Sequence, residues 1–130
     1  IVHIADATAE VIKSKGIKKV ALLGTRFTME QDFYKNKLIE NGIEVLVPEE
    51  HERNAINDII YKELCLGVIS QDSKAMLLEL VNKMSAAGAE GVILGCTEIG
   101  LLISQQDTKV PLYDTTLIHA REAALNAVRD

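Results

Sequence analysis

The stretch Gly91-Val92-Ile93-Leu94-Gly95 decides the fold, because it is a short, uninterrupted apolar run with glycine at both ends. Such a run is typical of a strand that is buried on both faces of a parallel sheet. Three other apolar segments contain or adjoin a Gly or Pro in the same way, namely Val20–Gly24, Ile43–Val47 and Val110–Tyr113. The sequence therefore predicts four short, buried strands.

Amphipathic helical patterns separate these strands, with apolar residues at helical spacing. Thr28 and Gln31 have the spacing of a capping box, so Thr28 is the predicted N-cap of its helix. Asp114 is a suitable N-cap for the last helix. The predicted helices are Ala5–Lys15, Thr28–Glu40, Glu50–Leu66, Gln71–Ala87 and Thr115–Asp130, with a further short helix before the last strand.

The alternation of helices and buried strands predicts the fold class. Strands that are connected through helices run parallel, and the helices then cover both faces of the sheet. Right-handed crossovers, with the second strand on one side of the first and the later strands on the other, give the order 2-1-3-4. We therefore expect a three-layer, flavodoxin-like α/β fold with a four-stranded parallel sheet.

The composition excludes several classes of partner. The chain has 130 residues, 48% of them hydrophobic and 25% charged, which suits one globular core. The charges sum to 14 − 19 = −5, and the sequence has no large basic patch. We therefore expect no nucleic acid partner. No segment approaches the ~20 apolar residues of a membrane span, and the two cysteines favour a cytoplasmic protein. Because the first residue is Ile1 and not Met, we expect a piece of a longer protein.

The strand order also predicts the place of a binding site. In an open parallel sheet, ligands bind beyond the carboxyl ends of the strands, where the strand order reverses. For the order 2-1-3-4 this point lies between the first and third strands. The first strand ends in Gly24-Thr25-Arg26-Phe27-Thr28, and the third ends in Gly95-Cys96-Thr97-Glu98. We therefore expect these two segments to face each other.

Cys96 is the first candidate for chemistry in this site. A thiol that opens a short helix has its thiolate stabilised by free backbone amides, which can bring its pKa from about 8.5 to roughly 7. Such a thiol serves as a general base or a nucleophile, and Glu98 is close enough in sequence to orient or deprotonate it. The alternative is a buried core cysteine, which is the interpretation that we favour for Cys65.

Thr25 and Thr28 flank a loop whose hydroxyls and free amides can receive an anion such as a carboxylate. Thr28 can equally be a helix cap and nothing more. Arg26 could pair with a substrate carboxylate, although an exposed loop arginine is more often solvated. No CxxC, HExxH or GxGxxG motif occurs, so the sequence supports neither a metal nor a dinucleotide.

Residues 92–102, Val-Ile-Leu-Gly-Cys-Thr-Glu-Ile-Gly-Leu-Leu, closely resemble the second cysteine signature of the aspartate/glutamate racemase family. Within that family, the chain is most similar to the bacterial broad-specificity amino-acid racemases. The resemblance extends to four further segments: His3–Asp6, Ala21–Met29, Glu63–Gly67 and Tyr113–Thr115.

The resemblance implies racemisation of an amino acid, aspartate or glutamate, without pyridoxal phosphate or any other cofactor. Two bases on opposite faces of the substrate would remove and return the α-proton. Cys96 would be one base, with Thr97 and Glu98 beside it as substrate-binding residues, and Thr25 and Thr28 would lie near the substrate carboxylate. Because the α-proton is far less acidic than a thiol, the site has to stabilise the carbanion with aligned donors and exclude water.

The resemblance also implies a division of the protein. Residues 1–114 correspond to the second of two similar lobes, and residues 115–130 to a C-terminal helix that packs on the first lobe. The first lobe carries the partner base in an Asn-Thr motif that this chain lacks, so the isolated chain is expected to be inactive. Some relatives have a lysine near the position of Cys65 that reaches the substrate. Family members often form dimers, so a homodimer is expected.

Other interpretations remain open at this point. A different thiol-dependent enzyme of the same superfamily, such as a hydantoin racemase, a maleate isomerase or an arylmalonate decarboxylase, differs mainly in its substrate pocket. A non-catalytic flavodoxin-like binding module is the other alternative. A phospho-receiver is disfavoured, because Gly24-Thr25-Arg26 and Gly95-Cys96 stand where its acidic residues would lie.

Overall fold

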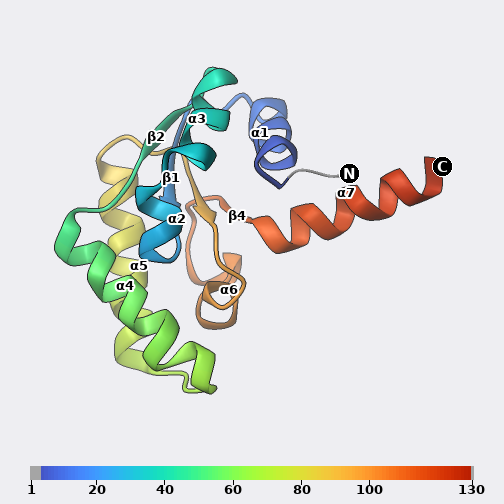
Figure 1. The fold of residues 1–130 in the computed structure, drawn as a ribbon. Helices are drawn as coiled ribbons and strands as arrows, with labels where there is room; N and C mark the ends of the chain where they lie inside the picture. Colours follow the sequence, from blue (N-terminus) through green and yellow to red (C-terminus); the bar gives the residue numbers. More distant parts are fainter. Residues whose placement is uncertain (1–3, 130) are drawn as a thin grey trace.

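The computed structural model describes residues 4–129 and consists of a sheet between two layers of helices (Figure 1). The strands are β1 (Lys19–Leu23), β2 (Glu44–Leu46), β3 (Gly91–Leu94) and β4 (Leu112–Asp114). All neighbouring strands are parallel, and their order is β2-β1-β3-β4. The predicted fold class and strand order are therefore confirmed.

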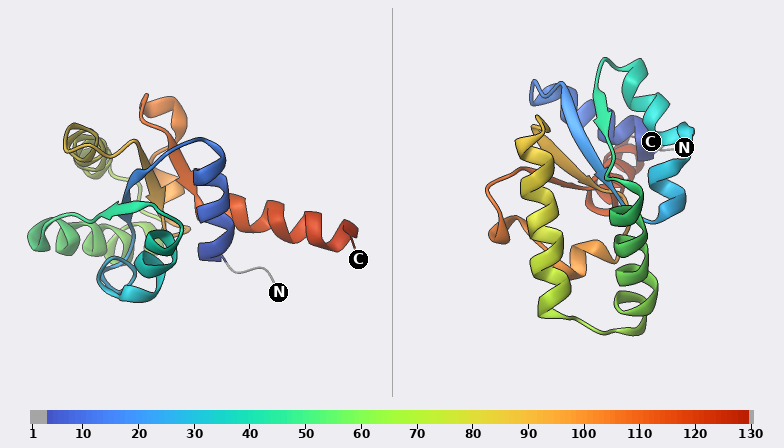
Figure 2. Two further views of the ribbon diagram at one scale, coloured as in Figure 1. Left: turned by 90° about the horizontal axis from the view of Figure 1, so that it is seen from above. Right: turned by 90° about the vertical axis from the view of Figure 1, so that its left-hand side faces the viewer.

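The helices connect the strands in the predicted sequence, and α4 and α5 lie side by side on one face of the sheet (Figure 2). No helix in the described part of the chain is long and apolar enough to cross a membrane. The α-helices are α1 (Ile4–Ser14), α2 (Arg26–Glu30), α3 (Asp32–Glu40), α4 (Glu50–Lys62), α5 (Gln71–Ala86), α6 (Ile99–Leu102) and α7 (Thr115–Arg129), and the 3-10 helices are η1 (Leu64–Leu66) and η2 (Gln105–Asp107).

Alternate residues of the central strands enter two separate cores. In β1, Val20 and Leu22 pack with α1 and α3, whereas Ala21 and Leu23 pack with α4 and α5. All four side chains are fully buried. This burial on both faces explains why the strands appear in the sequence as continuous apolar runs without polar alternation. Each large apolar side chain buried in this way contributes about 1.5–3 kcal/mol to folding.

The prediction of a single helix over residues 28–40 is wrong. The chain forms two helices there, α2 and α3, which separate at Gln31, where the backbone is extended with ψ 150°. The cause is tertiary packing. Met29 belongs to the core beneath α4 and α5, whereas Tyr34 belongs to the core beneath α1, on the other face of the sheet. One straight helix cannot place these two side chains in both cores.

The helix predicted over Glu50–Leu66 is also shorter than expected. The α-helix ends at Lys62, and the 3-10 helix η1 follows and ends at Gly67, whose φ of 78° suits glycine. Within this turn Leu64 is buried but Cys65 is exposed, so the prediction that Cys65 packs in the core is wrong. The other predicted boundaries lie within about two residues of the observed ones, as is usual for helix ends.

The first turns of α7 pack on the rest of the fold. The helix contacts α1, and Ile118 packs against the core on that side. Beyond this contact α7 runs away from the sheet (Figures 1 and 2), and the exposed fraction of Leu117 is 69%. The last residue of the predicted helix, Asp130, lies outside the described residues.

Gly91 provides a test of the packing between β3 and β4. A Cβ atom at Gly91 would lie 2.7 Å from Cε2 of the Tyr113 ring. We expect Gly91→Ala to displace this ring and to lower the free energy of unfolding by about 1–3 kcal/mol, measured by urea denaturation. In a Tyr113→Leu background, which removes the edge of the ring, the same substitution should cost less. An equal cost in both backgrounds would contradict the steric explanation.

Candidate active site

The carboxyl ends of β1 and β3 lie in direct contact, as the strand order predicts. The N–H of Gly95 donates a hydrogen bond to the carbonyl of Leu23 at 2.7 Å. A Cβ atom at Gly95 would lie 3.1 Å from that carbonyl oxygen and 3.2 Å from Cγ2 of Thr28, and one at Gly24 would lie 3.3 Å from Thr28. Thr28 therefore covers both glycines, and the two predicted site segments meet at this point.

Thr25 and Thr28 form a pair in the loop after β1. Thr25 Oγ1 accepts a hydrogen bond from the Thr28 N–H at 3.2 Å and lies 3.1 Å from Thr28 Oγ1. Thr25 is thus the N-cap of α2, and the prediction that Thr28 is the cap is wrong. The cap lies at Thr25 because its backbone is extended, with φ −67° and ψ 162°, whereas Thr28 is already helical.

Cys96 follows Gly95 directly and is half-buried against the core beneath α4 and α5. Its Sγ–H donates a hydrogen bond to Glu98 Oε2 at 3.0 Å. Burial, and after it the hydrogen bond to Glu98, raise the pKa of the Cys96 thiol to about 11. The N–H groups of Glu98 and Ile99 lower the pKa, as expected, but their effect is smaller. The prediction of a depressed thiol pKa is therefore wrong.

Thr97 is exposed and lies on the side of the loop that faces α7. Its Oγ1 is 3.3 Å from Oγ1 of Thr116, in the first turn of that helix. Sequence reasoning did not identify Thr116 as part of the site. The strand order could have indicated it, because β4 lies beside β3 and the residues after both strands share one edge of the sheet.

Arg26 forms its polar contacts with Glu30 and Asn57, which are not among the predicted site residues. Its Nε lies 3.2 Å from Glu30 Oε2, and its backbone N–H donates to Asn57 Oδ1 at 2.9 Å. Arg53 reaches the same Glu30 oxygen at 3.1 Å. Hydrogen bonds from Arg53 and Arg26 lower the pKa of Glu30. This cluster connects α2 to α4 through Glu30 and Arg53.

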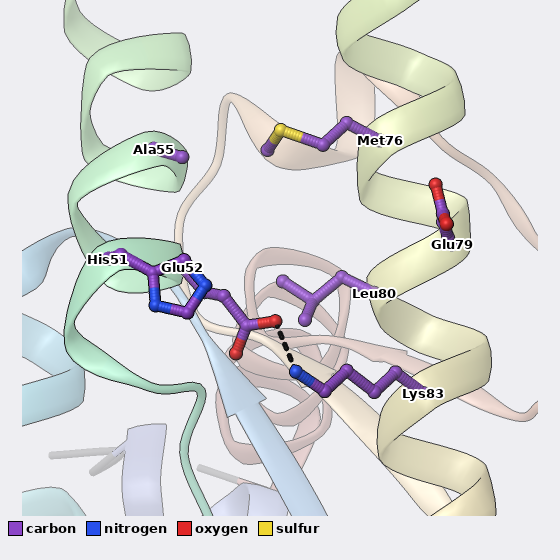
Figure 3. Close-up of a pocket in the computed structure, with 7 residues that line it drawn as sticks. All are labelled: His51, Glu52, Ala55, Met76, Glu79, Leu80 and Lys83. Carbon is purple, nitrogen blue, oxygen red and sulfur yellow. Dashed lines mark hydrogen bonds and ion pairs between the residues drawn. The ribbon is translucent and has the colours of Figure 1, made fainter.

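A cavity of about 480 Å³ lies between α4 and α5 (Figure 3). Across it, Lys83 Nζ donates to Glu52 Oε2 at 2.8 Å. None of its lining residues belongs to the segments that follow β1, β3 or β4, so the cavity is separate from the Cys96 site. The lining residues are His51, Glu52, Ala55, Met76, Glu79, Leu80 and Lys83.

Among the described residues, one group has the spacing of metal ligands, namely Glu49, His51 and Glu52 at the start of α4. Their polar atoms already have partners. Glu52 accepts a hydrogen bond from the Glu49 N–H in a capping box and pairs with Lys83, and His51 lies 3.6 Å from a Glu49 oxygen. These contacts explain why the three residues lie close together, since they cap the N-terminus of α4.

Comparison with characterised proteins identifies a relative of similar sequence. The chain is 26% identical, over 121 residues, to a broad-specificity amino-acid racemase of Bacillus subtilis. The match covers 93% of this chain and 52% of that protein.

Two solved structures share the fold over nearly the whole chain. A candidate Asp/Glu racemase from Yersinia pestis is 54% identical with a TM-score of 0.93, and the match covers 97% of this chain and 55% of that one. An aspartate racemase homologue from Pyrococcus horikoshii is 44% identical with a TM-score of 0.91, and the match covers 98% and 56%. The chain therefore spans about half the length of these relatives.

The sequence profile of one family matches residues 1–123, which is almost the entire chain. The match includes both segments that meet at the strand ends, with Thr25 and Thr28 on one side and Cys96 and Glu98 on the other. The chain belongs to the Asp/Glu/hydantoin racemase family.

Proposed function

We propose that this chain is one catalytic lobe of an amino-acid racemase that acts on aspartate or glutamate without a cofactor, with Cys96 as one of two bases. The observation that carries the proposal is the hydrogen bond of 3.0 Å from the Cys96 thiol to Glu98, at the point where β1 and β3 meet. Membership of the family supports racemisation of amino acids in general.

Cys96 would begin one direction of the reaction as the proton donor. Because burial and the hydrogen bond to Glu98 raise the pKa of the thiol to about 11, the resting lobe holds the protonated form at neutral pH. A two-base racemase starts each turnover with one base protonated and the other free. A protonated Cys96 would therefore deliver its proton to the carbanion, while the base on the opposite face removes the α-proton. The reverse direction would begin with the Cys96 thiolate.

The neighbours of Cys96 would orient the reacting groups. Glu98 accepts the thiol proton in a hydrogen bond, which sets the direction in which that proton points. Thr25 and Thr28 place two hydroxyls in the loop after β1, and Thr97, the residue after Cys96, places a third at an exposed position. We propose that these hydroxyls donate to a carboxylate of the substrate. Donors aligned in this way stabilise the negative charge that develops when the α-proton leaves.

The second base would come from a first lobe that this chain does not contain. The relatives are about twice as long as the matched region, which leaves room for such a lobe in them. We propose that residues 1–114 form the second lobe and that the helix of residues 115–130 packs on the first. The course of α7 away from the sheet and the exposed side chain of Leu117 support this role.

Solvent exchange at the α-carbon tests the activity. In D2O, the full-length protein should replace the α-hydrogen of aspartate or glutamate with deuterium, as followed by NMR. Cys96→Ser should lower the exchange rate at least about 100-fold, because a serine hydroxyl is a poor proton carrier at neutral pH. Cys65→Ser, at the exposed cysteine of η1, is the matched control and should leave the rate unchanged.

Two results would contradict this proposal. If the full-length protein exchanges neither amino acid but does exchange a substituted hydantoin, the substrate class is wrong. If Cys96→Ser keeps the wild-type rate with both enantiomers, Cys96 is not a base.

Residues 1–130 alone should show almost no exchange. With only one of two bases present, the rate should fall at least about 100-fold below that of the full-length protein, measured in the same NMR assay. Circular dichroism would show that the isolated lobe is folded. A folded lobe that exchanges at the full rate would disprove the need for a second lobe.

The pH dependence of alkylation tests the environment of Cys96. The carboxylate of Glu98 raises the pKa of the thiol, so Glu98→Gln should lower the pH at which iodoacetamide reacts at half its maximal rate, from about 11 toward the ordinary thiol value. Both proteins would carry Cys65→Ser, so that only Cys96 reacts. Glu79→Gln, on the exposed side of α5, is the control and should not change the profile. A shift to higher pH would refute the assigned cause.

A further inference from the structure

Consecutive residues at the start of α7 contact the segment that carries Cys96. The hydroxyl of Thr115 donates a hydrogen bond to the carbonyl of Leu94 at 3.1 Å, and Thr115 is buried. The hydroxyl of Thr116 lies 3.3 Å from that of Thr97. One contact therefore lies before Cys96 in the chain, and the other lies directly after it.

Asp114 adds a third contact, at the far end of the same segment. A Cβ atom at Gly100 would lie 2.7 Å from Asp114 Oδ2, so the carboxylate of Asp114 packs directly against the backbone of α6. Its other oxygen, Oδ1, accepts hydrogen bonds from the N–H groups of Thr116 at 2.9 Å and Leu117 at 3.4 Å. The prediction that Asp114 caps the last helix is thereby confirmed. The side chain of Asp114 therefore contacts both α6 and α7.

The pairing of β3 with β4 explains why these contacts can form. Leu94 and Asp114 are direct neighbours in the parallel register, so both strands end at the same level of the sheet. The chain after β3 has little regular structure of its own, because α6 contains only four residues. Contacts from the next strand and helix therefore supply much of the support for residues 95–98, which we call the Cys96 loop.

We infer that Asp114, Thr115 and Thr116 are positioning residues, which hold the Cys96 loop and α7 as one mechanical unit. The inference rests on the proposed function, in which Cys96 transfers a proton. Proton transfer requires the thiol to lie within hydrogen-bond reach of the substrate, and a misplacement of about 1 Å can cost about 100-fold in rate. In this arrangement, whatever surface receives α7 also determines where Cys96 lies.

Paired substitutions separate the hydroxyls from the packing of the same side chains. The double variant Thr115→Val/Thr116→Val keeps the shape of both residues and removes both hydrogen bonds. The double variant Thr115→Ser/Thr116→Ser keeps the hydroxyls and removes the methyl groups. Thr108→Val is the matched control, because its hydroxyl accepts a hydrogen bond from the Val110 N–H, away from the Cys96 loop. All proteins would be full-length and carry Cys65→Ser.

The first readout is the alkylation of Cys96 by iodoacetamide across the pH range from about 7 to about 11. The valine variant should react about threefold faster or more at low pH, because a released loop exposes the thiol and relieves its burial. The serine variant and Thr108→Val should match the wild type. Thermal unfolding measured in parallel shows that the compared proteins are folded.

The second readout is α-proton exchange of the amino-acid substrate. For the valine variant, kcat should fall about tenfold while KM stays within about twofold, because the loop positions the base and the other hydroxyls still bind the substrate. The serine variant should retain the wild-type kcat. A role in stability alone would predict the reverse order, since the buried methyl group of Thr115 is lost in the serine variant.

Three results decide the inference. Wild-type alkylation and kcat in the valine variant would overturn it, as would equal losses in the serine and valine variants. If the valine double variant does not fold, Thr116→Val alone, at an exposed position, should still shift the alkylation profile, and an unchanged profile would overturn the inference. If the wild type exchanges no amino acid, the proposed function fails, but the alkylation comparison still decides whether the hydroxyls of Thr115 and Thr116 hold the loop.

Discussion

The contact between the carboxyl ends of β1 and β3 is the constraint on which the rest of the structure depends. Gly95 donates its N–H to the Leu23 carbonyl at 2.7 Å, and neither Gly24 nor Gly95 has a side chain to separate the strands. Thr28 can therefore lie over both glycines, and Cys96 leaves the sheet directly from a paired strand. The position of the thiol is set by the sheet and not by a long loop, which is how rigid elements position a reactive group.

The parts of the fold that could be predicted from the sequence are those that local patterns determine. Val20–Gly24 and Gly91–Gly95 indicate strands because burial on both faces removes every polar residue from them. Their order then follows from the handedness of crossovers, and the contact of Thr28 with Gly95 follows from the order. The division of residues 28–40 at Gln31 could not be predicted in this way. It depends on Met29 and Tyr34 packing on opposite faces of the sheet, which no helical period reveals.

The electrostatics of the site could be predicted only in part, for a related reason. The backbone amides near Cys96 follow from its place at the start of a helix, and they do lower the pKa of the thiol. Burial depends on which helices cover the loop. Its larger effect, together with the hydrogen bond to Glu98, raises the pKa to about 11. The contact of Thr116 with Thr97 also needs the register of β3 and β4, in which Leu94 lies beside Asp114. Register and burial are tertiary properties, whereas caps and periods are local ones.

The protonated state of Cys96 has a consequence for the chemical durability of the protein. Peroxides and other oxidants attack thiolates and react slowly with thiols, so a half-buried thiol with a raised pKa resists conversion to sulfenic and sulfinic acids. A cysteine that served as a free thiolate in the resting state would be exposed to that damage throughout the life of the protein. In this structure, the burial and the Glu98 hydrogen bond that keep the proton on sulfur also protect the sulfur from irreversible oxidation.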